Sequence, residues 1–381
     1  MKKLKITLAL VFAAALAFAQ KAEPIPSYAK EQREMHWYRQ QEKAWNQITQ
    51  QNPSDRNAWY NLFKVTRIIS MHDTTDKRKG DERNEAMDAV LSRMLKAIPN
   101  SYEYNFCKWQ MGGNDMSYYP FLEKAVALEP ERPEHIDYMI NIGEMERNLS
   151  QRNEYSLRKI NVGEMSAGMM YYNYNVLIGL ERNAILLTAG DNDTYPAWAL
   201  QAQGIRKDVK VLNLYLLHLK EYREKIFAEL GLKNVDLDDQ NEDEFFNRQL
   251  VQHLSKNTGG YPVYVALTSA GCNHLLTDIQ QDLYLTGLAY VYKNTAFDNM
   301  AVLKKNMEQL FALDYLDKAF YQEISIGRLK EINRNYVVPM LKLYQHYTEA
   351  GDVQRQNWIK AKLILVSKDT EEEESILKYL D

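Results

Sequence analysis

Residues 183–217 read NAILLTAGDNDTYPAWALQAQGIRKDVKVLNLYLL, and this stretch decides the fold. An apolar run is followed by a polar turn, a short helical pattern and a second apolar run, which is the order of a parallel β-α-β unit. Ligands of open parallel sheets bind at the carboxyl ends of the strands. The polar turn Asp191-Asn192-Asp193-Thr194 follows the first apolar run directly, so we expect it at such an edge.

The region around this stretch, residues 161–300, predicts a Rossmann-like α/β domain with a small parallel sheet of about four strands. The runs are rich in Val, Leu, Ile and Tyr, and the first three are almost continuously apolar, as strands buried on both faces should be. We expect strands at 184–189, 209–216, 262–268 and 283–292, and helices at 195–203, 220–230 and 243–256.

The flanking regions, 20–160 and 301–381, read as helices. Pro53, Pro99 and Pro130 each follow an amphipathic run and precede an aromatic-rich one, at steps of 46 and 31 residues. A tetratricopeptide repeat is about 34 residues long, and the charged insertion at 71–82 accounts for the longer step. The segment YTEAGD at 347–352 matches the turn between the two helices of such a repeat. We predict degenerate tetratricopeptide-like pairs, with a generic helical bundle as the alternative.

Residues 1–19 have the pattern of a secretory signal peptide. Three lysines precede the apolar run 6–16, and Ala17-Phe18-Ala19 is a small-x-small cleavage site. The protein is therefore expected to be exported, either to the periplasm or to the cell surface. No later run approaches the roughly 18 apolar residues of a membrane span, so no membrane insertion is expected.

Charge and cysteine content restrict the partners. Removing the three signal lysines from a net charge of −4 leaves −7, which disfavours binding to the phosphate backbone of nucleic acids. Cys107 and Cys272 are the two cysteines. They lie in different predicted domains and would be either buried thiols or one disulfide, an alternative that the sequence leaves open.

The polar turn has two interpretations. Its carboxylates and amide could bind a divalent cation or grip sugar hydroxyls at the mouth of the sheet. Alternatively, Asp193 or Thr194 caps the following helix, and Pro196 lies in its first turn. A single cap explains one polar residue rather than four, so we predict that Asp191, Asn192, Asp193 and Thr194 face a ligand.

Two histidines complete the candidate site. His218 follows the second predicted strand, and His274 follows the third within TSAGCNH, residues 268–274. Both are predicted to line the pocket. A nucleophile formed by Ser269 or Cys272 with a histidine is an alternative, but its spacing matches no known nucleophile turn. We assign no catalytic residue.

Common cofactor and metal motifs are absent from the sequence. It contains no G-x-G-x-x-G, no phosphate-binding Walker loop, no H-E-x-x-H and no G-x-S-x-G. The acidic segment 236–247 lacks the central glycine and terminal glutamate of a calcium loop. No cofactor and no metal site is assigned.

The segment quoted first resembles the soluble C-terminal region of the bacterial DUF2723 family, membrane proteins related to protein O-mannosyltransferases and common in Bacteroidetes. In that family a strand ends in G-D-N-D-T and is followed by an aromatic-Pro helix, a G-[IV]-R-x-D-V turn and a second strand. The corresponding elements here are 190–194, Tyr195-Pro196, 204–209 and 211–217. The resemblance implies an α/β fold with residues 191–194 facing a ligand.

This chain differs from the family in important respects. It lacks the family's multi-span membrane half, so glycosyl transfer is not carried over. Tyr195 stands where phenylalanine is usual, and His218-Leu219 replaces Asn-Thr.

We therefore expect an exported binding or scaffold protein. Its helices would hold a protein or peptide, and its α/β edge would bind a small polar, glycan-related ligand. A membrane glycosyltransferase or a glycan is a candidate partner. The alternative is a glycan-acting enzyme, a transferase or hydrolase, that uses Asp191 or Asp193.

Overall fold

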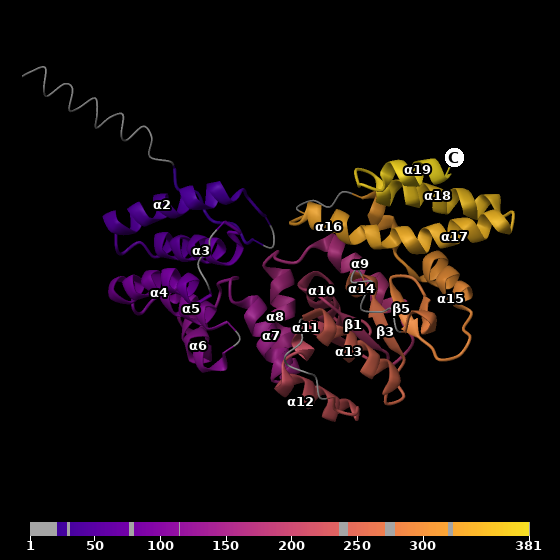
Figure 1. Ribbon diagram of the computed structural model, residues 1–381, viewed down its shortest axis with the longest axis horizontal. Coiled ribbons are helices and arrows are strands. Elements are labelled where there is room, and N and C mark those ends of the chain that lie inside the picture. Colours follow the sequence, from indigo (N-terminus) through magenta and orange to yellow (C-terminus); the bar gives the residue numbers. More distant parts are fainter. Residues whose placement is uncertain are drawn as a thin grey trace, which may run out of the picture. The chain divides into compact units, whose positions relative to one another are not determined.

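A computed structural model of the protein describes residues 21–28, 31–75, 80–113, 115–235, 243–270, 279–318 and 323–380. The chain divides into two compact units, Met1–His135 and Ile136–Asp381. Figure 1 shows the elements of each unit. The predicted signal peptide, residues 1–19, lies outside the described residues.

The first unit is helical. Asp55 and Ser101 cap α3 and α5, since each side chain accepts a hydrogen bond from a backbone N–H of the first turn. Pro53 and Pro99 lie in the turns before these helices. The core is aromatic, with Trp59, Phe63, Tyr102 and Phe106 among its buried residues. The helices are α2 (Met35–Gln51), α3 (Arg56–His72), α4 (Gly80–Ala97), α5 (Tyr102–Gly112) and α6 (Tyr119–Leu128).

The second unit contains the sheet and begins earlier than the expected α/β domain. Its first helices are α7 (Ile136–Met145), α8 (Leu149–Asn161) and α9 (Ala167–Ile178). Ile136 and Ile140 of α7 belong to the same buried cluster as Leu186 of the sheet. The border at His135 therefore replaces the expected border at residue 160, because α7 and α8 pack on the α/β core.

The α/β prediction holds at the level of class, but the sheet is mixed rather than parallel. It has five strands in the order β2-β1-β3-β5-β4. β1 pairs with β2 and β3 in parallel, and β5 pairs with β3 and β4 in antiparallel. The strands are β1 (Ile185–Thr188), β2 (Lys210–Asn213), β3 (Val263–Ala266), β4 (Leu283–Leu285) and β5 (Ala289–Tyr292).

The predicted strand 209–216 ends at Asn213, because Leu214–Leu217 forms a short helix, and the larger correction concerns the predicted strand 283–292. It is a hairpin, because the chain reverses between β4 and β5 at Gly287, whose φ is +146°. A Cβ at this position would lie 2.7 Å from Phe311 Cζ, so the turn needs glycine for both its backbone angle and its packing. The residues on both sides of Gly287 are apolar, so the sequence reads as one continuous strand.

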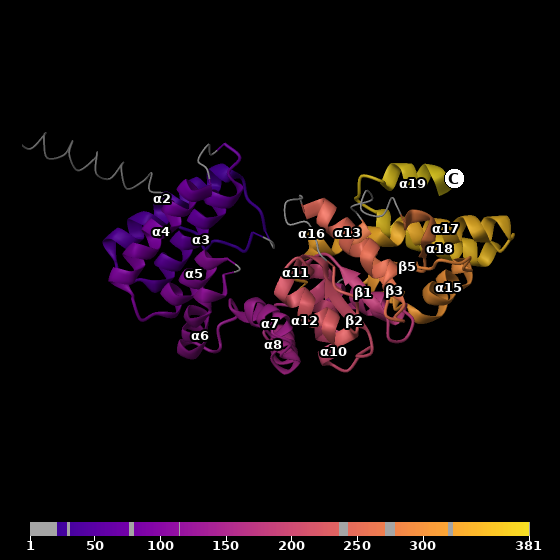
Figure 2. The same cartoon turned by 60° about the horizontal axis from the view of Figure 1, so that its bottom comes forward.

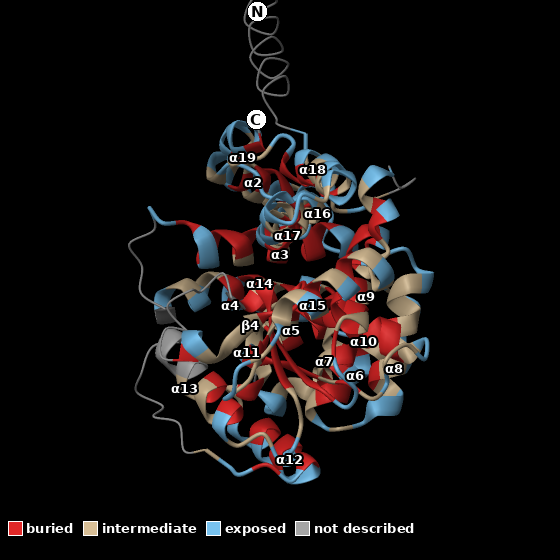
Figure 3. Cartoon of the chain, turned by 90° about the vertical axis from the view of Figure 1, so that its right-hand side faces the viewer, coloured by how far each residue is buried: buried red, intermediate tan, exposed pale blue. Residues whose placement is uncertain are grey.

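The two crossovers of the parallel strands cover opposite faces of the sheet. On one face, α10 (Asp191–Ala202) packs through Trp198 in the cluster that holds Leu186. On the other face, α12 (Lys220–Leu230) and α13 (Asp243–Lys256) join the cluster of Ile185 and Leu187. Figure 2 shows these helices around the strands, and Figure 3 shows that much of the sheet is buried.

The strand order places a topological switch point at β1. The chain moves from β1 to β2 on one side and then returns to β3 on the other side. Ligands of doubly wound sheets bind where neighbouring crossovers diverge, at the carboxyl ends of the strands. For this sheet, that position lies between the turns that follow β1 and β3.

The C-terminal helices share the core of the sheet and form no separate unit. Tyr336 and Leu363 lie in the same buried cluster as Leu186. Gly351, with φ +67°, and the N-cap Asp352 form the turn predicted at 347–352. The elements are α15 (Asn299–Lys305), η3 (Asn306–Leu310), η4 (Leu313–Asp317), α16 (Ile326–Asn333), η5 (Arg334–Tyr336), α17 (Val337–Glu349), α18 (Val353–Ser367) and α19 (Glu373–Leu380).

Among the described residues, every helix is either too short or too polar to cross a membrane. Helices pack as consecutive pairs at α2–α3, α7–α8 and α17–α18. Assignment of these pairs to tetratricopeptide repeats stays a prediction.

Candidate functional site

The turn after β1 is organised by Asp193. Its carboxylate accepts hydrogen bonds from the backbone N–H groups of Ala189, at 3.0 Å, and Gly190, at 2.8 Å. Gly190 is the N-cap of α10, so Asp193 at the third helical position supplies half of a capping box. The Thr268 hydroxyl, from the short helix α14 (Leu267–Ala270) that follows β3, donates to the same carboxylate at 2.6 Å. Asp193 therefore ties together the segments that follow two neighbouring parallel strands.

These contacts leave Asp193 little capacity for chemistry. The residue is 4 % exposed. Burial raises the pKa of its carboxyl, whereas the hydrogen bonds from Thr268, Ala189 and Gly190 oppose that rise. Because all three donors come from the protein itself, the carboxylate oxygens are already hydrogen-bonded, and their role is to hold the turn in place.

Thr194 is also a structural residue. Its hydroxyl lies 2.7 Å from the Thr188 hydroxyl on β1 and accepts a hydrogen bond from Asn213 Nδ2 on β2 at 2.9 Å. Asn213 in turn caps the short helix α11 (Leu214–Leu217) by accepting from the Tyr215 N–H at 2.8 Å. Thr194 thus joins the ends of β1 and β2 and is buried.

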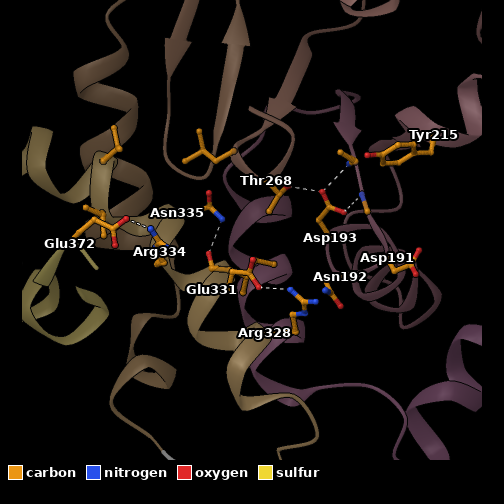
Figure 4. A pocket seen from close by; sticks show the side chains of 16 residues that line it. Asp191, Asn192, Asp193, Tyr215, Thr268, Arg328, Glu331, Arg334, Asn335 and Glu372 are labelled. Atoms are coloured by element: carbon orange, nitrogen blue, oxygen red, sulfur yellow. Dashed lines mark hydrogen bonds and ion pairs between the residues drawn. The ribbon is translucent and has the colours of Figure 1, made fainter. Parts of the chain in front are cut away.

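Asp191 and Asn192 differ from their two neighbours because both are exposed. Asn192 is held through its backbone carbonyl, which accepts from Asn173 Nδ2 at 2.9 Å. Although part of its side chain is exposed, nearby protein atoms remove part of the hydration of the Asp191 carboxyl and raise its pKa. The charge of Asp137 adds to this rise, while Lys159 and a hydrogen bond with Tyr195 oppose it. In Figure 4, Asp191 points away from the other labelled side chains.

A cavity of about 650 Å³ opens at the switch point of the sheet. One wall is the sheet edge, which contributes Gly190 to Asp193, Tyr215 and Thr268. The opposite wall, called the helical wall, comes from α16, η5 and the residue before α19, and contributes Arg328, Glu331, Arg334, Asn335 and Glu372. Figure 4 shows both sets of side chains. Leu267, Val337 and Val338 add apolar surface.

The charged side chains of the helical wall form ion pairs with one another. Arg328 Nη1 lies 2.8 Å from Glu331 Oε2, and Arg334 pairs with Glu372. With Asp193, whose carboxylate faces this region, the lining carries three carboxylates and two guanidinium groups, a formal excess of one negative charge, since the Asp191 carboxylate points away. Such a lining offers many donors and acceptors but no unpaired arginine for an anion.

The structure separates the six predicted site residues. Asp191, Asn192 and Asp193 line the cavity, whereas Thr194 is buried beneath it. His218 follows α11 and is not among the lining residues, although its ring lies 6.0 Å from that of Tyr215, which does line the cavity. His274 and Cys272 fall outside the described residues. Within the described part of the chain, no three His, Cys, Asp or Glu side chains are grouped to hold a metal.

The residues of the helical wall were missed at the sequence level. Glu372 belongs to the charge run 371–374, which would be taken for a solvated surface, yet it pairs with Arg334 and lines the cavity. Arg328 and Glu331 form an ordinary i, i+3 pair on an amphipathic helix. Nothing in their spacing indicates that this helix covers a sheet edge formed by residues distant in the sequence.

Comparison with known families finds a similarity to one family over part of the chain. Residues 169–230 match the TMEM260-associated domain 2. The match runs from α9 through β1, α10 and β2 to the end of α12, and so includes the turn 190–194. The matched family is not DUF2723, and that resemblance stays a prediction. No curated protein matches the chain.

Proposed function

We propose that the protein is an exported binding or scaffold protein whose sheet-edge cavity takes a small polar ligand. The observation that carries this proposal is the cavity of about 650 Å³ at the switch point between β1 and β3. Its volume falls in the usual range for ligand sites, roughly 300–1,000 Å³. The mixture of amides, paired ions and an exposed tyrosine suits a ligand with several hydroxyl groups, such as part of a glycan.

The helical regions support the second half of the proposal, which is an interaction with a protein or peptide. Consecutive helix pairs that pack side by side form the grooves of repeat proteins, and both ends of this chain contain such pairs. The partner would meet the protein in the periplasm or at the cell surface, where a membrane glycosyltransferase is one candidate. Nucleic acid remains disfavoured by the negative charge.

Catalysis at this edge is the less supported proposal. A glycan-acting enzyme would need a general acid and a general base within reach of the substrate. Asp193 is enclosed by three donors, and Asp191 points away from the cavity side chains. The remaining carboxylates, Glu331 and Glu372, are held by arginines.

A pair of variants tests the binding proposal. We expect neutral mono- and disaccharides, screened by thermal shift with the full chain, to raise its unfolding temperature. Asn192→Ala should abolish that rise while leaving the unfolding temperature of the free protein unchanged. Asp193→Ala should lower the unfolding temperature of the free protein because it removes the cap.

The outcomes separate the two interpretations of the turn. If Asn192→Ala responds to the saccharides as the wild type does, the turn only caps α10 and the cavity proposal fails. If a saccharide is converted to product by the wild type and not by Asp191→Asn, the enzyme proposal replaces it.

A further inference from the structure

A second pocket lies in the C-terminal part of the second unit, between η4, α16 and the end of α18. Its volume is about 250 Å³, and it shares no lining residue with the sheet-edge cavity. Leu316, Leu329 and Val366 provide an apolar floor. The pocket is smaller than the roughly 300–1,000 Å³ of sites that enclose drug-sized ligands, so it suits a single side chain rather than a long acyl chain.

The rim of this pocket is positively charged. It carries Lys318, Lys330, Lys368 and one acid, Asp369. Lys330 Nζ lies 3.1 Å from Asp369 Oδ2, which pairs one lysine. Within the described residues Lys318 and Lys368 have no ion-pair partner, so the lining carries two excess positive charges on a chain whose net charge is −4. We call it the lysine-rimmed pocket.

An amide at the rim adds a neutral donor. The Tyr315 hydroxyl donates to Asn333 Oδ1 at 2.6 Å, which orients the amide so that Nδ2 is the group left to donate. Ile326 also lines the pocket and is 62 % exposed, so it adds uncovered apolar surface to the rim. Donors for an anion therefore stand directly beside uncovered apolar surface.

We propose that the lysine-rimmed pocket binds the C-terminal residue of a partner peptide. Its apolar side chain would lie on Leu316, Leu329 and Val366, and its carboxylate would meet Lys318, Lys368 and the Asn333 amide. A chain terminus is favoured over an internal Asp or Glu because only a terminal residue presents an apolar side chain and a carboxylate together. Free phosphate would leave the apolar floor uncovered.

This inference rests on the proposed interaction of the helices with a protein or peptide, and it is independent of the sheet-edge cavity. Charge-assisted hydrogen bonds to a carboxylate are stronger than those to a neutral amide. Amidation of the bound terminus should therefore weaken binding about tenfold or more.

The experiment uses random short peptides with free C-termini, selected on the immobilised full chain. Selected peptides should end in an apolar residue, and fluorescence anisotropy should show that their C-terminal amides bind about tenfold more weakly. The double variant Lys318→Glu, Lys368→Glu should no longer bind the peptides that have a free C-terminal carboxylate. Lys305→Glu, Lys342→Glu makes the same change of charge outside the pocket and should bind as the wild type does.

Two results would overturn the inference. Selection without any apolar preference at the last position would exclude the pocket as a terminal-residue site. Equal affinity for the acid and amide forms would show that peptides bind without recognition of the carboxylate. The proposed interaction with a peptide would then stand, and the assignment of the lysine-rimmed pocket as its site would be wrong.

Discussion

The parallel strands have polar segments at both edges of the sheet. The segments before β1 and β2 form the amino edge, and those after β1 and β3 form the carboxyl edge. The two edges differ in how far their polar side chains are hydrogen-bonded and buried. At the amino edge, the Arg206 guanidinium donates to the carbonyls of Leu177, Leu180 and Glu181 at 2.6, 3.0 and 2.7 Å and pairs with Asp208. At the carboxyl edge, Asp193 and Thr194 are similarly satisfied, but Asp191 and Asn192 remain exposed beside a cavity. The two edges therefore differ in the exposure of their polar side chains and in the cavity beside one of them, and not in polarity alone.

The largest effect should come from Arg206→Ala at the amino edge. The change removes the guanidinium donor from three backbone carbonyls and leaves Asp208 with the Asn183 N–H, and it should cost about 3 kcal/mol of the free energy of unfolding. Urea denaturation measures this loss. A cost below about 1 kcal/mol would show that the amino edge is no more structural than its partner edge.

Asp193→Asn should be the next most destabilising change. Asparagine keeps one acceptor oxygen but turns an N–H group toward the donors on Ala189 or Thr268, which should cost about 2 kcal/mol. Thr268→Val provides the matched check, since it removes only one of these bonds and should cost about 1 kcal/mol. Equal costs for the two variants would contradict the capping role of Asp193.

The β1–α10–β2 unit could be predicted because its signals are local. The apolar runs, Pro196 and the polar turn lie within 35 consecutive residues, and the structure reproduces their order. The hairpin at Gly287 was missed because one glycine within an apolar run resembles a continuous strand. The helical wall of the cavity depends on packing of residues 328–372 against the sheet, for which the sequence has no local pattern.

Asp208 makes the amino edge sensitive to acid. Hydrogen bonds from Arg206 hold its pKa at about 2, against an ordinary value of 3.8. Since the pKa is lower in the folded state, the stabilisation is complete above pH 3.8 and is lost as pH falls toward 2. Because the carboxyl is partly exposed, we expect Asp208→Asn to cost only about 1 kcal/mol at neutral pH.

The measurement is urea denaturation of wild type and Asp208→Asn at neutral pH and near pH 2. The difference between them should shrink at the lower pH. A constant difference would mean that the carboxylate charge contributes nothing to the amino edge.

Asn192→Ala should have the smallest effect on stability. Its side chain is exposed and its structural contact is made by the backbone carbonyl, so the free energy of unfolding should change by less than about 0.5 kcal/mol. Urea denaturation of Asn192→Ala and Asp193→Asn compares the free energies of unfolding of two variants in the same turn. A loss as large as that of Asp193→Asn would make all four residues of the turn structural.

The most direct test of the sheet-edge cavity is a crystallographic fragment screen of the full chain with neutral polyols and small amides. We predict that fragments bind between Asn192 and Arg328, against the exposed ring of Tyr215. Fragments found only at other surfaces, with nothing but water between these two walls, would contradict the assignment of this edge as a ligand site.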